Sequence, residues 1–465
     1  MKSRGRLWAT LLVVFGLIVA ACGSGDEGTT ETTSGGTTET TAASTETTAA
    51  TTDTTAAEVE EVTLRVLVHS QEPMTTFVQE FSADFEAANP GVTVDVAVVG
   101  AGDLATVTQT RLSANDVDVI DIFGFANAVQ PYMGGATPPA WQTLIEAGLL
   151  LDITDEAWVG NYDEPSIQQA GSFQDRVYAV NLGRTIYGGM FVNLDLLASV
   201  GVDVPTTWGE LVSVCEAVKA AGNECMTNGG QDGWPVFVGA YGLLGALFPD
   251  QEGLVEDLYT GEFTWDSPDA ASLWERYQVY AQNMLESGTT GLAHDAATFR
   301  YSAGDVAFLP TGAWQAPNLE SEADFNWTYV PFPGSDNAAD NQNLFGKYDQ
   351  GWAIAANSPN VEVAKAYVAA FSDPAVYQDF VSTTGFIPTQ PTAVLETTLG
   401  QAIAPFLGNY RVGFEQYWVQ PAGAGQWANG SQGAAWFAPF NEWTDPAALA
   451  RQAQADLQAA LDELS

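Results

Sequence analysis

From residue 62 onward the sequence alternates between short apolar runs and amphipathic stretches, and this alternation restricts the fold more than any other feature. Val62–His69, Val92–Val99 and residues 117–123 are rich in β-branched residues, which predicts buried strands. Between the first two, phenylalanines at every fourth position from Phe77 form the apolar stripe of a helix that ends at Asn-Pro-Gly, residues 89–91. Strands that alternate with helices predict an α/β fold with helices on both faces of the sheets.

Later segments continue the same pattern. Thr207 and Glu210 form a capping box, which predicts a helix that starts at Trp208. A further helix is expected over Val361–Phe371, and a last one over Pro446–Leu464, where proline occupies the first helical position. The 465 residues are enough for two or three domains with real cores.

The N-terminus has the features of an export signal. Lys2, Arg4 and Arg6 precede an apolar stretch that is short for a membrane-spanning helix and ends in small residues. The run at residues 19–22, Val-Ala-Ala-Cys, resembles the bacterial lipobox, which implies lipidation of Cys22 as the first mature residue. The alternative is an ordinary cleaved signal in which this cysteine has no special role.

Residues 23–61 predict a tether. They consist mainly of Thr, Ala, Gly, Ser and Glu, with no aromatic and no basic residue. Such a stretch buries too little apolar surface to offset its ordering entropy, so it is expected to be disordered. With about 39 residues its root-mean-square reach is roughly 35 Å. We therefore expect a lipid-anchored extracellular protein on the outer face of the cytoplasmic membrane, with residues 1–21 as signal and 22–61 as tether.

The charge balance excludes several classes of function. The chain has 14 basic and 58 acidic residues, a formal net charge of -44, which argues against nucleic-acid binding. Two histidines, His69 and His294, offer little for a metal centre or a catalytic triad, and no cofactor is expected. Cys215 and Cys225, ten residues apart in an exported chain, are expected to form a disulfide, with two free thiols as the alternative.

A glycoside hydrolase is the enzyme class that composition does not exclude. Hydrolysis needs only two carboxylates about 5–10 Å apart, and Glu72, Asp121 and Asp349 are candidates for such a pair. Carboxylates near a sugar site more often accept hydrogen bonds from hydroxyl groups. A non-enzymatic binding protein is therefore the first interpretation.

Three stretches are similar to the extracellular solute-binding proteins of ABC importers, the group that includes maltose-binding protein. The first is Tyr-Ala-Val at 178–180 through Gly-Gly-Met-Phe-Val-Asn-Leu-Asp-Leu-Leu at 188–197 to Pro-Thr-Thr-Trp at 205–208. The second is Asp-Val-Ala-Phe at 305–308 followed by Thr-Gly-Ala-Trp at 311–314. The third is Gly-Trp-Ala-Ile-Ala at 351–355 with Gly-Phe-Ile-Pro at 385–388.

The resemblance implies a two-lobed periplasmic-binding-protein fold with a multi-strand hinge. It places residues 62–181 and 345–389 in the N-terminal lobe and residues 182–344 and 390–465 in the C-terminal lobe. A ligand would bind in the cleft between the lobes, and closure would present a surface to the permease subunits. The expected protein is a monomer that binds a small molecule and makes or breaks no bond.

Sugar recognition is the expected task, because aromatic faces stack on sugar rings and polar groups bind the hydroxyls. The family position and the chemistry together select Trp314 and Trp352. The further candidates for the ligand site are Glu72, Asp121, Asn127, Arg184, Trp234, Tyr348 and Trp427, and Phe125 or Tyr241 could also line the cleft. For each of them a packing or surface role is the alternative. Arg184 would suit an acidic or phosphorylated sugar, and the acidic field would suit a cationic solute.

Overall fold

A six-stranded mixed sheet organises the first lobe in the computed structural model, which describes residues 61–123 and 127–464. Strands β1 (Val62–His69), β2 (Val92–Val99) and β3 (Val119–Phe123) are parallel, with Val62 opposite Val92 and Val66 opposite Val119. Strand β11 (Leu344–Ile354) runs antiparallel to both β3 and β6 (Ala179–Ile186) and parallel to β12 (Tyr410–Val412). The first two expected strands are confirmed at both ends, and the third begins two residues later than expected.

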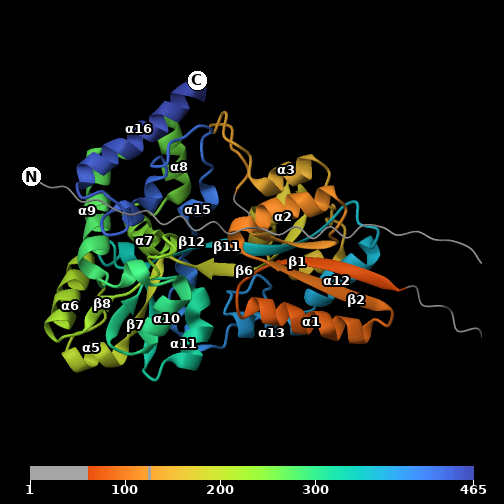
Figure 1. Ribbon diagram of the computed structural model, residues 1–465, viewed down its shortest axis with the longest axis horizontal. Coiled ribbons are helices and arrows are strands. Elements are labelled where there is room, and N and C mark those ends of the chain that lie inside the picture. Colours follow the sequence, from red (N-terminus) through yellow and green to blue (C-terminus); the bar gives the residue numbers. More distant parts are fainter. Residues whose placement is uncertain (1–60, 124–126, 465) are drawn as a thin grey trace, which may run out of the picture. The chain divides into compact units, whose positions relative to one another are not determined.

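Helices cover both faces of this sheet, as the alternating pattern predicted (Figure 1). On one face, helices α1 (Met74–Ala88), α12 (Val361–Phe371) and α13 (Pro374–Thr384) share a core with the sheet. The phenylalanine stripe of α1 lies in this core, where Phe77 packs edge-on against Phe371 and Phe380. On the other face α2 (Ala101–Ser113) and α3 (Ala140–Glu146) pack on the sheet.

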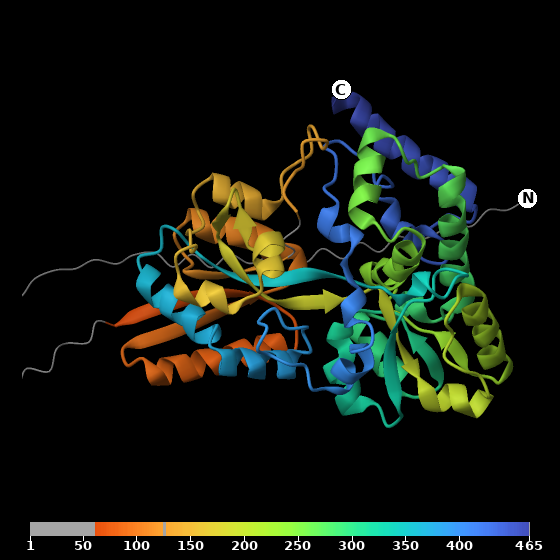
Figure 2. The same ribbon diagram turned by 180° about the vertical axis from the view of Figure 1, so that it is seen from behind.

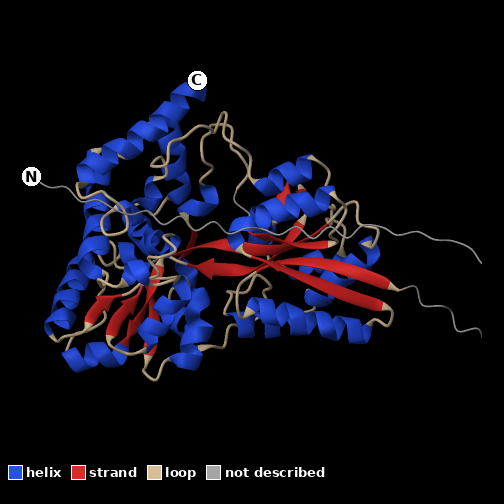
Figure 3. Cartoon of the chain, viewed as in Figure 1, coloured by secondary structure: helices blue, strands red, loops and turns tan. Residues whose placement is uncertain are grey.

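A four-stranded sheet organises the second lobe, and its strands form a second group in Figure 3. The order is β10 (Trp327–Pro331), β7 (Gly189–Asn193), β9 (Val306–Leu309) and β8 (Glu224–Met226). Strand β7 is antiparallel to both of its neighbours, and β8 is parallel to β9. The principal core of this lobe is the largest hydrophobic cluster among the described residues.

The helices of the second lobe follow the expected caps. Helix α6 (Trp208–Ala220) starts at Thr207, whose hydroxyl accepts the N–H of Glu210 at 3.3 Å. Helix α16 (Pro446–Leu464) begins at the expected proline and buries Leu449, Ala453 and Leu457. The other helices of this lobe are α5 (Leu194–Val200), α7 (Trp234–Leu247), α8 (Gln251–Thr260), α9 (Ala271–Val279), α10 (His294–Ser302), α11 (Ala316–Glu322), α14 (Thr398–Ile403) and α15 (Phe414–Tyr417), while α4 (Glu164–Ala170) packs on the first sheet.

Short elements complete the chain. They are the strands β4 (Ser172–Phe173) and β5 (Arg176–Val177), the 3₁₀ helices η1 (Ala157–Asn161), η2 (Pro268–Ala270), η4 (Thr289–Gly291), η5 (Ala313–Gln315), η6 (Asp340–Gln342), η7 (Leu407–Asn409) and η8 (Gly430–Trp436), and the π-helical turn η3 (Tyr280–Met284).

The chain passes between the two sheets at several places. It leaves β6 for β7 at Tyr187 and Gly188, whose N–H groups both donate to the carbonyl of Phe345 at 2.9 and 3.0 Å. The boundary expected between residues 181 and 182 falls inside β6. The chain returns from β10 to β11 and leaves again after α13, as the ribbon shows from behind in Figure 2.

A further link joins the lobes outside these crossings. The N–H of Asn127, just after β3, donates to the carbonyl of Gln416 at 2.7 Å, and Ala136 forms a β-bridge with Pro421. Between them, Met133 is buried in the principal core of the second lobe. We call residues 127–136 the cross-lobe segment.

The N-terminal expectations concern residues that lie outside the described part of the chain. These are the signal, the lipidation site Cys22 and the tether, apart from its last residue, Glu61. Among the described residues, no helix is long and apolar enough to cross a membrane.

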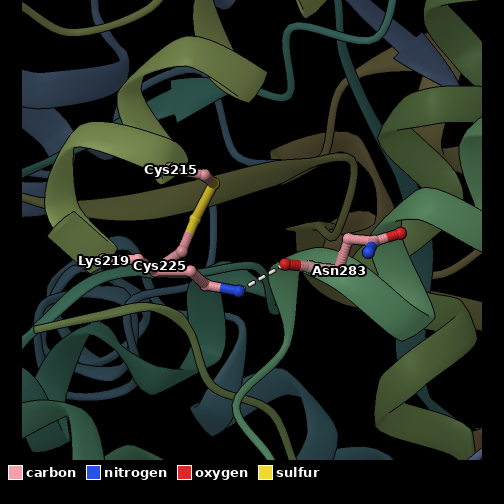
Figure 4. Close-up of a disulfide and its surroundings, with 4 residues drawn as sticks. All are labelled: Cys215, Lys219, Cys225 and Asn283. Atoms are coloured by element: carbon pink, nitrogen blue, oxygen red, sulfur yellow. Dashed lines mark hydrogen bonds between the residues drawn. A yellow bond between two sulfur atoms is a disulfide. The ribbon is translucent and has the colours of Figure 1, made fainter.

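The expected disulfide joins Cys215 of α6 to Cys225 of β8, with their Cα atoms 4.9 Å apart (Figure 4). Both cysteines are buried in the second-lobe core. Beside them the Nζ of Lys219 donates to the carbonyl of Asn283, so the end of α6 is also fixed to the turn after α9.

The disulfide should stabilise the second lobe against unfolding. Closing a loop of about ten residues lowers the conformational entropy of the unfolded chain, which stabilises the folded protein by about 2–3 kcal/mol. We expect the double variant Cys215→Ala/Cys225→Ala to lose about that much free energy of unfolding, measured by urea denaturation. Reductant should destabilise the wild-type protein and leave the double variant unchanged, and equal stability of the two proteins would contradict the prediction.

Candidate ligand-binding site

Three aromatic side chains of the second lobe gather where α7, α10 and η5 begin. The ring centroids of Trp234 and His294 lie 4.5 Å apart, and that of Trp314 lies 6.3 Å from Trp234 and 6.4 Å from His294. Trp234 is 38% exposed, which is unusual for so large an apolar side chain. We call these three residues the aromatic platform. Partly exposed indoles next to polar groups are typical of small-molecule sites.

Hydrogen bonds fix the imidazole of the platform. The indole Nε1–H of Trp314 donates to Nε2 of His294 at 3.2 Å, and the side-chain amide of Gln315 lies 2.6 Å from the same nitrogen. An indole N–H can only donate, so Nε2 is the acceptor and the ring proton is on Nδ1. Burial lowers the pKa of His294 by more than the nearby Asp295 and Asp232 raise it. The ring is therefore neutral at pH 7.

The local sequence explains why Trp314 lies where it does. It follows β9 in the turn Gly312-Ala313-Trp314, and its ring folds back over the backbone of Gly312. A Cβ atom at Gly312 would lie 1.9 Å from Cζ3 of the indole. Only glycine permits this contact, so the Gly-x-Trp spacing of the sequence determines the position of the ring.

The aromatic surface continues along α7 towards the strands that cross between the lobes. Trp234, Phe237 and Tyr241 follow one helical stripe, and Phe237 contacts Tyr241 with ring centroids 5.7 Å apart. Tyr241 in turn contacts Tyr187, in the connection between β6 and β7, at 5.0 Å. Phe237 and Trp314 both pack against the cluster that Tyr187 and Tyr241 form. The stripe therefore connects the platform to the crossing strands.

Polar side chains of the first lobe meet at the carboxyl ends of its parallel strands. His69 ends β1, and Gln350 of β11 lies with its side-chain nitrogen 3.1 Å from Nδ1 of His69 and 2.8 Å from Oε1 of Gln71. Asp121 of β3 accepts the N–H of His69 at 3.1 Å. In α/β sheets, ligands bind at this edge of the strands. Amide groups such as these can donate to and accept from hydroxyl groups.

An ion-pair network around the buried Lys347 lies between the polar edge formed by His69, Gln71 and Gln350 and the aromatic stripe on α7. Nζ of Lys347 is 3.1 Å from Asp349 Oδ1 and 3.4 Å from Glu415 Oε1. Burial alone would lower the pKa of Lys347, but the two carboxylates raise it, so the ammonium stays charged. Asp349 and Glu415 both act electrostatically on the buried hydroxyl of Tyr187. The network thus joins β11 to the stripe on α7.

Two of the expected ligand residues, Trp314 and Trp234, come together in the platform. Asp121 lies at the polar edge but is only 1% exposed, so it supports the strand ends and offers no surface to a ligand. Glu72 is exposed and accepts the hydroxyl and N–H of Thr76, as a cap on α1. Asn127 begins the cross-lobe segment.

The other expected residues lie elsewhere. Trp352 is fully buried in the core beneath the six-stranded sheet, against Phe371, so its ring cannot stack on a ligand. Tyr348 is also buried, against the opposite face of that sheet. Trp427 packs edge-on against Trp436 and Trp443 near α16. Of the two cleft aromatics that were considered, Tyr241 is part of the stripe and Phe125 lies outside the described residues.

Arg184 is also separate from the platform. Its Nη2 donates to the carbonyl of Pro388 at 2.8 Å, and its guanidinium lies 5.3 Å from the centroid of the Tyr410 ring. The argument that it favours an acidic sugar therefore loses its structural basis.

Several residues of the site were missed by sequence reasoning. His294, Gln315, Gln71, Gln350 and the Lys347 network have no motif that marks them. The one available signal was that His294 is one of only two histidines in the chain. For Phe237 the helical spacing from Trp234 was present, but the helix itself had not been predicted.

Comparisons with known proteins identify the family of the chain. Residues 69–378 match the family model described as bacterial extracellular solute-binding protein. The chain belongs to this family. Its two α/β lobes have the fold of solved solute-binding proteins.

Individual relatives are distant in sequence. A multiple sugar-binding protein of Streptococcus mutans is 22% identical over 317 residues, which is 66% of this chain and 70% of that protein. The solute-binding protein RafE in complex with raffinose has a TM-score of 0.69 at 20% identity, over 87% of this chain and 99% of that one. A sugar transporter of Bacillus licheniformis in complex with stachyose has a TM-score of 0.67 at 18% identity, over 87% and 100%. These structural likenesses concern the fold.

Asp121 of this solute-binding protein should make its stability depend on pH. Burial raises the pKa of Asp121 from 3.8 to about 7, and the Asp349 carboxylate adds to the rise. The native state therefore holds this proton more tightly than the unfolded state. The stabilisation is present below pH 3.8 and is lost as the pH rises through 7.

We expect the difference in free energy of unfolding between the wild-type protein and Asp121→Asn to fall by about 2–3 kcal/mol from pH 5 to pH 8. Urea unfolding at both pH values measures it. The matched control Asp324→Asn, at an exposed carboxylate, should differ from the wild-type protein by the same amount at both values. A pH-independent difference for Asp121→Asn would show that its carboxyl group has an ordinary pKa.

Proposed function

We propose that this chain is the lipid-anchored substrate-binding component of an ABC importer, which captures a sugar or oligosaccharide between its two lobes and delivers it to the permease. The observation that carries the proposal is the aromatic platform of Trp234, His294 and Trp314, with Trp234 38% exposed. The flat apolar faces suit the C–H faces of a sugar ring, and the neighbouring amides suit its hydroxyl groups.

The ligand would be held from both sides. Trp234 and Trp314 stack on it from the second lobe, while Gln71 at the strand ends of the first lobe, held by the buried amide of Gln350, binds hydroxyl groups. A ligand that contacts both lobes stabilises the closed arrangement, and closure is the signal that the permease receives. We place residues 62–181 and 345–389 in the first lobe and residues 182–344 and 390–465 in the second, and we propose that the protein works as a monomer.

A neutral ligand is favoured by the charges of the site. The buried ammonium of Lys347 already pairs with two carboxylates, and His294 is neutral. The family membership and the names of the relatives support a sugar, since the multiple sugar-binding protein of S. mutans and the raffinose complex of RafE are among them.

Catalysis is not part of the proposal. Of the three carboxylates considered for hydrolysis, Asp121 is sealed in the sheet, Asp349 is ion-paired and Glu72 caps α1. A retaining or inverting glycosidase needs an acid and a base that face the same bond. The family match supports binding without turnover.

The test is a titration of the purified protein with candidate ligands, followed by calorimetry and thermal shift. The panel holds neutral mono- and oligosaccharides, sugar phosphates, uronic acids and polyamines. A ligand at 100 times its Kd should stabilise the protein by about 2.7 kcal/mol. We expect one class of neutral sugar to bind. Trp314→Ala and Trp234→Ala should each weaken the binding of this sugar at least about tenfold, because each removes an aromatic face on which the sugar ring stacks.

Phe299→Ala is the matched control, because Phe299 is a 58% exposed aromatic residue of α10 outside the platform. It should bind like the wild-type protein. Binding of a polyamine or a sugar phosphate instead would be consistent with a solute-binding role but would refute the proposal that the ligand is a neutral sugar. Release of hydrolysis products would refute a pure binding role.

The lipid anchor has its own test. If Cys22 is the lipidated first residue, wild-type protein in cells of a lipoprotein-exporting bacterium should incorporate an alkyne-labelled fatty acid and fractionate with membranes. Cys22→Ala should lose the label and appear in the soluble fraction or as uncleaved precursor. Equal labelling of both proteins would refute the anchor without touching the binding proposal.

A further inference from the structure

A cavity of about 540 Å³ lies where α4, β6, the chain that follows α13, α14 and β12 meet. None of its lining residues belongs to the aromatic platform or to the polar edge of the first sheet. Its walls are mainly apolar, with Ile387, Leu395, Ile403 and Tyr410 among them. Two side chains in its lining carry charge, Arg184 and Asp163.

Arg184 is a cation with unused hydrogen-bonding capacity. Of its guanidinium donors, Nη2 donates to the carbonyl of Pro388, and in the described part of the chain no carboxylate forms an ion pair with it. Its backbone is held in place, because its N–H and carbonyl both bond to Ile387 at 2.9 Å. A half-buried guanidinium without a carboxylate is notable in a chain with 58 acidic residues. It is suited to bind a carboxylate through charge-assisted hydrogen bonds.

Asp163 is the counterpart on the same cavity. Its Oδ1 caps α4 by accepting the N–H of Ser166 at 2.8 Å, and its own N–H donates to Thr389 at 2.7 Å. Over the residues that the structure covers, Oδ2 has no hydrogen-bond partner. Burial raises the pKa of Tyr377 to about 12, and both cavity charges act on it, Arg184 lowering it and Asp163 raising it. The two opposite charges therefore lie near the same hydroxyl group without pairing with each other.

The mouth of the cavity is apolar. Val394 is 55% exposed and Leu407 is 41% exposed, and these are two of the few large hydrophobic side chains that the described residues leave in solvent. Exposed apolar residues that gather at a cavity indicate a binding surface more often than scattered ones do. An occupant with an apolar part would remove them from water.

We propose that this cavity binds a small zwitterion with an apolar side chain, such as an apolar α-amino acid. The carboxylate lies on Arg184, the ammonium lies on Asp163, and the side chain packs between Ile387, Leu395 and Ile403. A solute with only a carboxylate would face Asp163 unpaired, and a solute with only an ammonium would face Arg184 unpaired. A ligand that carries both charges satisfies both walls.

The test uses probes that differ by one charge. Calorimetry of the purified protein, without any sugar, compares leucine with 4-methylpentanoate, which lacks the ammonium, and with 3-methylbutylamine and leucinamide, which lack the carboxylate. We expect leucine to bind and each of the other three to bind at least about tenfold more weakly, as loss of a charge-assisted hydrogen bond requires.

Three variants locate the binding. Arg184→Gln and Asp163→Asn should each weaken the binding of leucine at least about tenfold. Asparagine keeps the helix cap at 163, so the second variant removes charge and retains the fold. Ala404→Trp fills the cavity from an exposed position of its lining and should abolish binding. Phe299→Ala is again the control and should bind leucine normally.

Circular dichroism of each variant verifies folding. Absence of leucine binding at about 10 mM, which corresponds to less than about 3 kcal/mol, would overturn the proposal. So would binding that all three cavity variants leave unchanged. Equal affinity for leucine and 4-methylpentanoate would overturn the zwitterion assignment, because Asp163 would then have no role.

Discussion

The pairing of β6 with β11 is the interaction on which the rest of the structure depends. One end of this ladder lies in the core of the first lobe, where Trp352 is opposite Val180, and the other end reaches the crossing at Gly346. The carbonyl of Phe345 then accepts the N–H groups of Tyr187 and Gly188 as the chain turns into the second sheet. The strands approach so closely that a Cβ at Gly346 would lie 1.8 Å from the carbonyl oxygen of Thr185. Because the same ladder carries Lys347, Asp349 and Gln350, the backbone that joins the lobes also places the polar groups between them.

How much of this was accessible from the sequence depends on the range of the interactions. Strands such as Val62–His69 and helices such as Pro446–Leu464 were predicted to the residue, because composition, caps and periodicity are local. The position of the Trp314 ring follows from the Gly-x-Trp spacing, which is itself a local constraint. The burial of Trp352 and the separation of Arg184 from the platform were not accessible from the sequence, because the face on which a strand residue lies follows from register. The ladder of β11 with β6 is irregular between Tyr348 and Gly351, which no period-two pattern reveals.

The acidity of the chain and the character of the site are separate properties. Most carboxylates of the described residues are at least partly exposed, whereas the buried ones are neutralised individually. Asp118 accepts hydrogen bonds from Arg65 and Ser358, and Asp349 pairs with Lys347. Asp121 holds its proton below about pH 7. The interior of the site therefore presents hydrogen-bonding groups and aromatic faces with little net charge, although the formal charge of the chain is -44.

The cross-lobe segment restricts how the two lobes can move. Met133 of this segment is buried in the principal core of the second lobe. Backbone contacts join Asn127 to Gln416 and Ala136 to Pro421. Withdrawing that side chain would expose a buried methionine at a cost of about 2 kcal/mol, in addition to the two backbone contacts. The segment therefore moves with the second lobe. The cross-lobe segment thus links the lobes at one edge, in addition to the crossing strands. Such a link favours rotation about a fixed axis over a motion in which the lobes separate.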